Sequence, residues 1–302
     1  LVPSGESAET GRANKRTVLA LKARTALYAA SPLFNSHQEG SQGYKELWYR
    51  AAKANKELIE TCEDAGMRLI DDYENLWDAK SYSIAIDELI FGCRAIRATN
   101  SFEKYNFPVG LENCRGGNCP TQTLVDAYEL KDSGERPDKK ADYDKNKPYY
   151  EGRDPRFEKT IAKNGDTKWP NWNETALETY QGGANAEPLS GGTPTGYYLK
   201  KYCQTSINTT TAKPTTDNHT WIIYRLGEFY LNYAEALFKY LGTAYATNNE
   251  FPIPANEMVS KTRRRTKVNM PKFPAGLDNK LWWEKYQNER MVELAFEGHR
   301  FW

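Results

Sequence analysis

Histidine and cysteine are scarce in this chain of 302 residues, which contains three His and five Cys. The histidines, His37, His219 and His299, lie far apart, and no two cysteines form a CxxC pair. Zinc sites need four closely spaced ligands, and nucleophilic catalysis needs a Ser or Cys within reach of a His. The sequence therefore predicts no metal site, and nothing in it calls for a cofactor.

The motifs of the large enzyme classes are also missing. There is no GxSxG, no HExxH, no phosphate-binding GxxxxGK loop and no dinucleotide loop. Pairs of carboxylates of the kind that cleave glycosidic bonds occur by chance among 40 acidic residues, so they are uninformative. We predict a protein without catalytic residues. An all-helical glycoside hydrolase is the alternative among enzymes.

Long apolar runs and an excess charge are absent too. No run reaches the roughly 18 apolar residues of a transmembrane helix. The 41 basic and 40 acidic residues nearly cancel, which argues against binding to nucleic acid. No signal peptide or lipid-acceptor cysteine opens the sequence, and it ends without a polar tail. We expect the chain to be an internal part of a longer protein.

Aromatic residues, by contrast, are plentiful. Twenty Tyr, eight Trp and eleven Phe make 13% of a sequence whose mean hydropathy is -0.80. Most such rings line the seams between packed helices, but exposed rings bind ligands. The composition therefore favours a binding protein.

Apolar residues recur at helical spacing in several parts of the chain. The predicted helices cover residues 12–31, 44–65, 219–241, 255–267 and 278–298. In the first of them, Val18, Leu21, Thr25 and Tyr28 fall on one apolar stripe, which is widened by Leu19, Ala23, Ala26 and Ala30. Helical hairpins at both ends of a chain are the layout of tetratricopeptide-type repeats. We predict a mainly α fold with tetratricopeptide-like helical hairpins and a long irregular, loop-rich binding region inserted between them.

The middle of the chain is rich in Gly, Pro, Asn and aromatic residues and has little helical period. Short strand-like runs occur at residues 123–125 and 197–199. So long an irregular stretch is more than a linker, and long loops on a rigid scaffold are where binding sites lie. We predict a hairpin scaffold over 11–98, a loop-rich ligand-binding region over 99–218 and a helical-repeat scaffold over 219–302.

Three smaller patterns also have a predicted role. Cys114 and Cys119 flank a flexible stretch that could close into a disulfide loop in an oxidising compartment, and this is left open. Glu289, Glu293 and Glu297 recur every four residues, and we expect them to pair with arginines. The basic run at residues 263–265 suits the negative pole of a helix end.

Five blocks of the sequence, in order, resemble the SusD/RagB family. They are GRANKRTVLALKARTALYAASPLFN at residues 11–35, PTQTLVDAYE at 120–129, GRDPRF at 152–157, YRLGEFYLNYAEA at 224–236 and ERMVELAFEGHRFW at 289–302. On this resemblance the chain, 1–302, is a single SusD-like unit. Gly152 stands where the family pattern has Asn, and the family's lipidated N-terminus and its C-terminal stretch are missing here.

The resemblance implies a surface-exposed, lipid-anchored protein of the outer membrane whose anchor lies outside this chain. Its implied partners are a SusC-like TonB-dependent outer-membrane transporter and an oligosaccharide ligand, which it captures without catalysis and delivers. A peptide-binding transporter lid is the alternative within the family, and a helical-repeat adaptor that binds only protein is the alternative outside it.

Sugars stack their C–H faces on aromatic rings, while Asn, Asp, Arg and Gln bond their hydroxyls. Two aromatic groups in the loop-rich region are therefore our predicted ligand contacts, with packing under their own loops as the other reading. They comprise Phe102, Tyr105, Asn106 and Phe107 in the first group and Trp169 and Trp172 in the second. Arg153, Asp154 and Arg156 belong to a family block, and we expect them to be structural.

Overall fold

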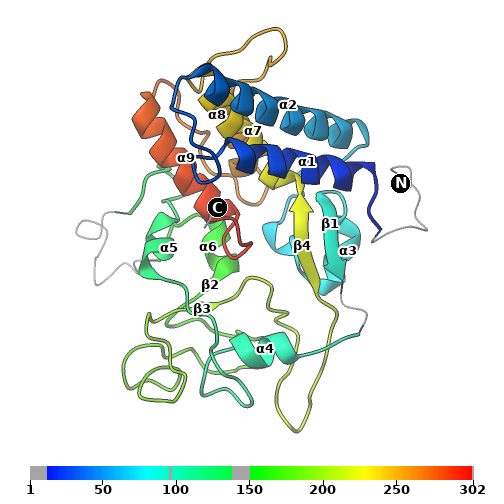
Figure 1. The fold of residues 1–302 in the computed structure, drawn as a ribbon. Helices are drawn as coiled ribbons and strands as arrows, with labels where there is room; N and C mark the ends of the chain where they lie inside the picture. The colour runs from blue at the N-terminus through cyan, green and yellow to red at the C-terminus, as the bar shows by residue number, and fades with distance from the viewer. Residues whose placement is uncertain (1–11, 95–96, 138–149, 301–302) are drawn as a thin grey trace. The chain divides into compact units, whose positions relative to one another are not determined.

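The computed structural model describes residues 12–94, 97–137 and 150–300 (Figure 1). The chain divides into two compact units. The first, which we call the helical unit, is built from the described parts of Leu1–Asp72, Ser83–Cys93 and Ile222–Trp302. The second, the loop unit, is built from the described parts of Tyr73–Tyr82 and Arg94–Trp221.

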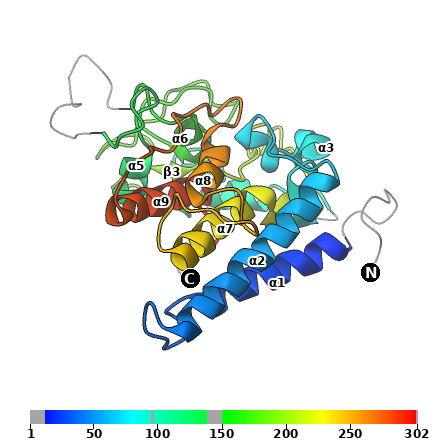
Figure 2. The same cartoon turned by 90° about the horizontal axis from the view of Figure 1, so that it is seen from above.

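The helical unit contains the long helices of the described chain. They are α1 (Lys15–Ala30), α2 (Gln42–Asp64), α7 (Leu226–Leu241), α8 (Ala255–Arg263) and α9 (Asn279–Glu293). Helices α1 and α2 lie side by side as a hairpin, and α2 and α8 both pack on α7 (Figures 1 and 2). The prediction of a mainly α fold with helical hairpins is confirmed.

The start of the third predicted helix is wrong. Residues Thr220–Arg225 form strand β4, which pairs with β1 (Leu89–Arg94), and α7 begins only at Leu226. This segment, TWIIYR, is rich in β-branched and aromatic residues, which favour a strand over a helix. Gly242 ends α7 as predicted, in the left-handed conformation with φ 75°.

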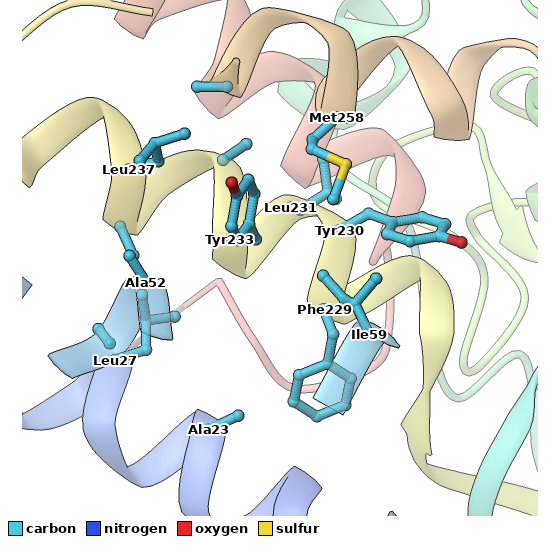
Figure 3. Packing of buried hydrophobic residues seen from close by; sticks show 14 of the residues in the cluster. Ala23, Leu27, Ala52, Ile59, Phe229, Tyr230, Leu231, Tyr233, Leu237 and Met258 are labelled. Atoms are coloured by element: carbon cyan, nitrogen blue, oxygen red, sulfur yellow. The ribbon is translucent and has the colours of Figure 1, made fainter. Parts of the chain in front are cut away.

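Helix α1 buries only part of the predicted stripe, including Leu19, Ala23 and Ala30. Val18 and Leu21 are 44% and 55% exposed, whereas Ala20 and Ala23 are fully buried. Figure 3 shows Ala23 and Leu27 of α1 directed toward α7. Small side chains let helix backbones approach closely, so the alanine side of the predicted stripe packs while Val18 and Leu21 remain outside.

Helix α7 is the centre of the helical core. Twelve of its sixteen residues are buried, which is typical of a helix surrounded by others. In Figure 3, Phe229, Tyr230 and Leu237 of α7 lie among Ile59 of α2 and Met258 of α8.

A cluster of buried charges lies in the same unit. Arg225 donates to Glu88 at 3.0 Å, to Glu293 at 2.7 Å and to Glu297 at 2.8 Å. Arg265 pairs with Glu88 and, at 2.9 Å, with Glu293. These five side chains, which we call the buried ion cluster, are 0–2% exposed. The prediction that the recurring glutamates pair with arginines is confirmed.

The basic run at residues 263–265 lies at the C-terminal end of α8, as expected, with Arg263 in the last turn and Arg264 at the C-cap. Arg263 is buried and pairs with Glu289 at 2.9 Å, and Arg265 belongs to the buried ion cluster. Only Arg264 is exposed, where it pairs with Glu257. Specific carboxylates therefore hold this run in addition to its position at the helix end.

The loop unit is built mainly of loops joined to short elements. These are the 3-10 turns Tyr73–Leu76 and Ala79–Ser81, then α4 (Ser101–Asn106), α5 (Gln122–Ala127), α6 (Pro155–Thr160), β2 (Ile161–Ala162) and β3 (Tyr198–Leu199), with α3 (Tyr82–Ala85) at its border. Strands β2 and β3 pair antiparallel, with Ile161 opposite Leu199. Residues 123–125 lie in α5 instead of a strand, because the Thr121 hydroxyl caps a helix by accepting from the Leu124 N–H.

Arg153, Asp154 and Arg156 are structural, as expected. Asp154 caps α6 by accepting from the Arg156 N–H and also pairs with the Arg156 guanidinium at 2.7 Å. Arg153 donates to the backbone oxygens of Val125 and Tyr128. All three are buried, and they join α6 to the end of α5.

The described residues contain free cysteines, no cluster suited to a metal ion and no helix suited to span a membrane. Cys114 and Cys119 are both free thiols, so the disulfide left open by the sequence is not formed. Among residues 12–94, 97–137 and 150–300, no group of His, Cys, Asp and Glu is placed to hold a metal ion. None of the helices described is both long enough and apolar enough to span a membrane.

Candidate functional site

The loop unit carries a pocket beside α4. Its volume is about 610 Å³, within the range of small-molecule sites. It is lined by Ser101, Lys104, Tyr105, Asn113, Cys114 and Arg115. We call it the α4 pocket.

Helix α4 supplies half of this lining. Ser101, Lys104 and Tyr105 are three and four residues apart, so they share one face of the helix. Glu103 and Asn106 on the other side are fully buried. The six-residue helix thus has a polar and aromatic outer face above a buried polar inner one.

Buried hydrogen bonds anchor the inner face. Glu103 accepts from the Gln204 backbone N–H at 2.9 Å and lies 2.8 Å from His219 Nε2. The His219 ring stacks on Trp221 at 5.5 Å between centroids. These contacts hold α4 to segments about a hundred residues away along the chain, and therefore fix the direction of its outer face.

The segment that follows α4 turns back alongside it. The Gly116 N–H donates to the Phe107 oxygen at 2.9 Å, and the Gly117 N–H donates to the Tyr105 oxygen at 2.6 Å. Asn113 sits in the left-handed region at φ 64°, which Asn tolerates better than most residues. This return brings residues 113–115 to the same pocket as the helix.

A second loop, at residues 208–215, fixes the returning segment. The Asn113 amide donates to the Thr209 oxygen at 2.8 Å, and the Thr209 hydroxyl donates to the Glu112 oxygen at 2.9 Å. Hydrogen bonds from the Thr211 side chain and N–H lower the pKa of Glu112. Burial raises the pKa of Cys114 to about 11, so this thiol is neutral at physiological pH.

Tyr105 is the exposed ring of the pocket, with 52% of its surface accessible. The ring lies across the backbone of Gly117, where a Cβ would come within 2.1 Å of Tyr105 Cε1. Only glycine leaves room for this contact, which holds the ring in place from one side.

We expect Gly117→Ala to displace the Tyr105 ring while the loop unit stays folded. Steric conflict with the added methyl forces the ring to another rotamer, at a cost of about 1 kcal/mol. Ligand affinity, measured by calorimetry, should fall by a comparable amount. In a Tyr105→Ala background the same change should have no further effect on affinity, and an additive loss there would contradict the proposed contact.

Three of the predicted ligand contacts are buried instead. Phe107 packs edge-on against Trp169 at 5.3 Å in the core of the loop unit. The Asn106 side chain accepts from Asn118 and donates to the Phe102 oxygen, so its amide is used internally. Buried side chains cannot reach a ligand in this structure, and Asn106, Phe107 and Trp169 are therefore supports of the site.

Phe102 and Trp172 are half-buried at the edge of the same core. Phe102 lies edge-on to Trp221 at 4.9 Å, and the Trp172 Nε1–H donates to the Ile207 oxygen. Neither residue lines the α4 pocket. Of the six predicted contacts, only Tyr105 does, and the structure adds Ser101, Lys104, Asn113, Cys114 and Arg115 to it.

The helical unit has a pocket of its own, of about 400 Å³. Three of its polar side chains are already engaged, since the Tyr286 hydroxyl donates to Glu235 at 2.8 Å and Arg290 donates to Asn232 at 2.7 Å. Burial lowers the pKa of its His299 to about 4. We therefore take the α4 pocket as the candidate site.

Comparisons with known proteins agree on the fold. A SusD-like protein from Bacteroides fragilis superposes with a TM-score of 0.75 at 25% identity, over 99% of this chain and 55% of that one. A SusD-like carbohydrate binding protein from Bacteroides fragilis gives a TM-score of 0.76 at 24% identity, over 99% and 53%. A laminarin binding SusD-like protein gives 0.58 at 19% identity, over 98% and 55%.

The chain thus spans about half the length of these solved structures. No curated protein matches it. The sequence profile of the SusD family matches residues 88–302, which is most of the chain and includes both strand β4 and the α4 pocket. This chain belongs to the SusD family.

Proposed function

We propose that this protein captures oligosaccharides at the α4 pocket and delivers them, uncleaved, to a SusC-like TonB-dependent transporter. The observation that supports this most directly is the exposed Tyr105 ring, held across Gly117 and surrounded by hydrogen-bonding side chains. The loop-rich region 99–218 is then the ligand-binding region, and the helical segments 11–98 and 219–302 are its scaffold.

The pocket has the two kinds of group that sugar binding needs. An accessible aromatic ring offers a stacking surface to the apolar C–H face of a pyranose. Ser101, Asn113 and Lys104 lie around that ring and can bond the hydroxyls at the edge of the sugar. The hydrogen bonds described above hold both sets of groups before a ligand arrives, which reduces the entropy lost on binding.

Binding without cleavage fits the charges of the pocket. Glycosidases place two carboxyl groups about 5–10 Å apart on either side of the bond that they cleave. None of the six lining residues is a carboxylate. The nearby Glu112 accepts the Thr211 N–H, and Glu103 is buried. The pocket therefore lacks the acid and base that hydrolysis requires.

The cellular setting is proposed from membership of the family. We place the protein on the outer membrane, exposed at the cell surface and held by an N-terminal lipid anchor outside this chain. Co-purification of the tagged protein with a TonB-dependent transporter from outer membranes would support this setting. Recovery of the protein without such a transporter would contradict it.

Tyr105→Ala is expected to weaken oligosaccharide binding by about 1–3 kcal/mol, the range for loss of a stacking ring. Tyr105→Phe should keep most of the affinity, because the ring remains. A glycan array on the full chain identifies the best oligosaccharide, and calorimetric titration of that compound then measures each variant.

The matched control is Tyr180→Ala. Tyr180 is 56% exposed, in the same unit, and does not line the pocket. Its replacement should leave the affinity unchanged. Equal losses from both alanine variants, or sugar release during the titration, would contradict the proposal. Binding of peptides but of no saccharide would favour the peptide-binding alternative.

A further inference from the structure

We infer that the ligand of the α4 pocket is an acidic oligosaccharide, carrying a carboxylate or sulfate group that Arg115 and Lys104 bind together. This inference rests on the proposed function and narrows its substrate class. It is carried by the charges at the pocket wall, because both ionised side chains that line the pocket are positive.

Neither of these cations has a carboxylate partner within the described residues. Other basic side chains of the loop unit do have one. Lys163 and Lys200 each lie 2.6 Å from an oxygen of Asp166, and Asp154 pairs with a buried arginine. Carboxylates thus neutralise several basic side chains of the unit, whereas the two cations at the pocket remain available.

The acidic groups nearest to the pocket do not change this conclusion. Burial raises the pKa of Cys114 most, and the nearby charges of Glu103 and Glu112 raise it further. Glu103 is fully buried, where His219 and the Gln204 N–H bond it. Glu112 is held by Thr211 and does not line the pocket. A ligand in the pocket therefore meets the two cations and neither carboxylate.

The side chains suit an anionic sugar in their geometry as well as their charge. Arginine presents a planar fork that bonds carboxylate and sulfate oxygens in pairs, and lysine adds a point charge. Tyr105, next to Lys104 on α4, offers its ring to the pyranose. One sugar unit can thus stack on the ring while its acidic substituent reaches the two cations.

The test titrates trigalacturonic acid, its methyl ester and a sulfated galacto-oligosaccharide of equal length into the full chain. The ester has the same ring geometry without the charge. We expect the acid or the sulfated sugar to bind more tightly than the ester, and its affinity to fall as salt is raised. The comparison of trigalacturonic acid with the sulfated sugar shows whether carboxylate or sulfate is the preferred group.

Arg115→Gln and Lys104→Gln should each lower the affinity for the acidic sugar by about tenfold, the usual effect of losing a charged hydrogen bond. The affinity for the ester should not change. Lys131→Gln is the matched control, because it removes an exposed positive charge from the same unit outside the pocket. It should have no effect on either ligand.

Two outcomes overturn the inference, and they are distinguishable. If acid and ester bind equally and both lose affinity in Tyr105→Ala, the site binds glycans without preference for charge, and only the inference fails. If no saccharide binds, or Tyr105→Ala changes nothing, the proposed function fails with it.

Discussion

Replacing Arg225 with alanine is expected to lower the free energy of unfolding by at least about 3–5 kcal/mol, enough to unfold many domains. The guanidinium is fully buried and donates to three carboxylates, those of Glu88, Glu293 and Glu297. Without it, these carboxylates stay buried with Arg265 as the remaining cation of the cluster. Uncompensated buried charge is among the most costly defects in a protein core.

The charge on Arg225 is secure in the native protein. Burial by itself lowers the pKa of the guanidinium, but the carboxylates of Glu297, Glu293 and Glu88 outweigh this and raise it well above its ordinary value. Arg225→Lys keeps a charge but not the fork that reaches all three carboxylates. We therefore expect it to destabilise the protein as well, by less than Arg225→Ala does.

Urea denaturation followed by circular dichroism measures both variants. Arg264→Ala is the matched control, since Arg264 pairs with Glu257 at the surface, where about 0–1 kcal/mol is expected. A loss for Arg225→Ala no larger than that of Arg264→Ala would show that the buried ion cluster does not stabilise the helical unit.

The cluster also explains why the family blocks identify the fold and not the ligand. Arg225 lies in one block, at residues 224–236, and Glu293 and Glu297 lie in another, at residues 289–302. Their side chains meet in the interior of the helical unit. The resemblance therefore rests on residues that hold the scaffold together, while the α4 pocket is lined by residues outside all five blocks.

The helices could be predicted from the sequence because helical periodicity is a local property. Predictions failed where the local structure is decided by a contact with a segment distant in the sequence. Strand β4 exists because β1 pairs with it, and the buried face of α1 is chosen by the close approach of α2 and α7. The size of the apolar side chains on α1 favoured Val18 and Leu21, which are exposed.

The predicted binding region holds the α4 pocket, but of the six predicted contacts only Tyr105 lines it. An aromatic residue at a given position looks the same in sequence whether it packs inward, like Phe107, or outward, like Tyr105. The helical spacing of Ser101, Lys104 and Tyr105 was a usable signal, because α4 places them on one face. Arg115 and Asn113 had no such signal, since the return of the chain at Gly116 and Gly117 brings them to the pocket.

The second large effect is expected from removing Trp169, an aromatic residue that packs inward. Trp169→Ala should lower the free energy of unfolding by about 3–5 kcal/mol, as removal of a large core side chain does. Trp169 is only 5% exposed, packs edge-on against Phe107 and has Lys200 Nζ 5.8 Å from its ring centre. If it were a ligand contact, as the sequence predicted, the variant would instead lose affinity and keep its stability.

Thermal and urea denaturation of Trp169→Ala, with Trp172→Ala as the control, separate these two roles. Trp172 is half-buried and outside the α4 pocket, so its loss should cost less stability than that of Trp169. A double-mutant cycle with Phe107→Ala should give a coupling of about 0.5–1.5 kcal/mol, as expected for an edge-on aromatic pair. Unchanged stability of Trp169→Ala together with lost sugar binding would show that Trp169 contacts the ligand, and would contradict its role as a support. The expected result instead assigns the predicted aromatic residues two roles. Phe107 and Trp169 form the packed core behind α4, and Tyr105 alone among them faces the ligand.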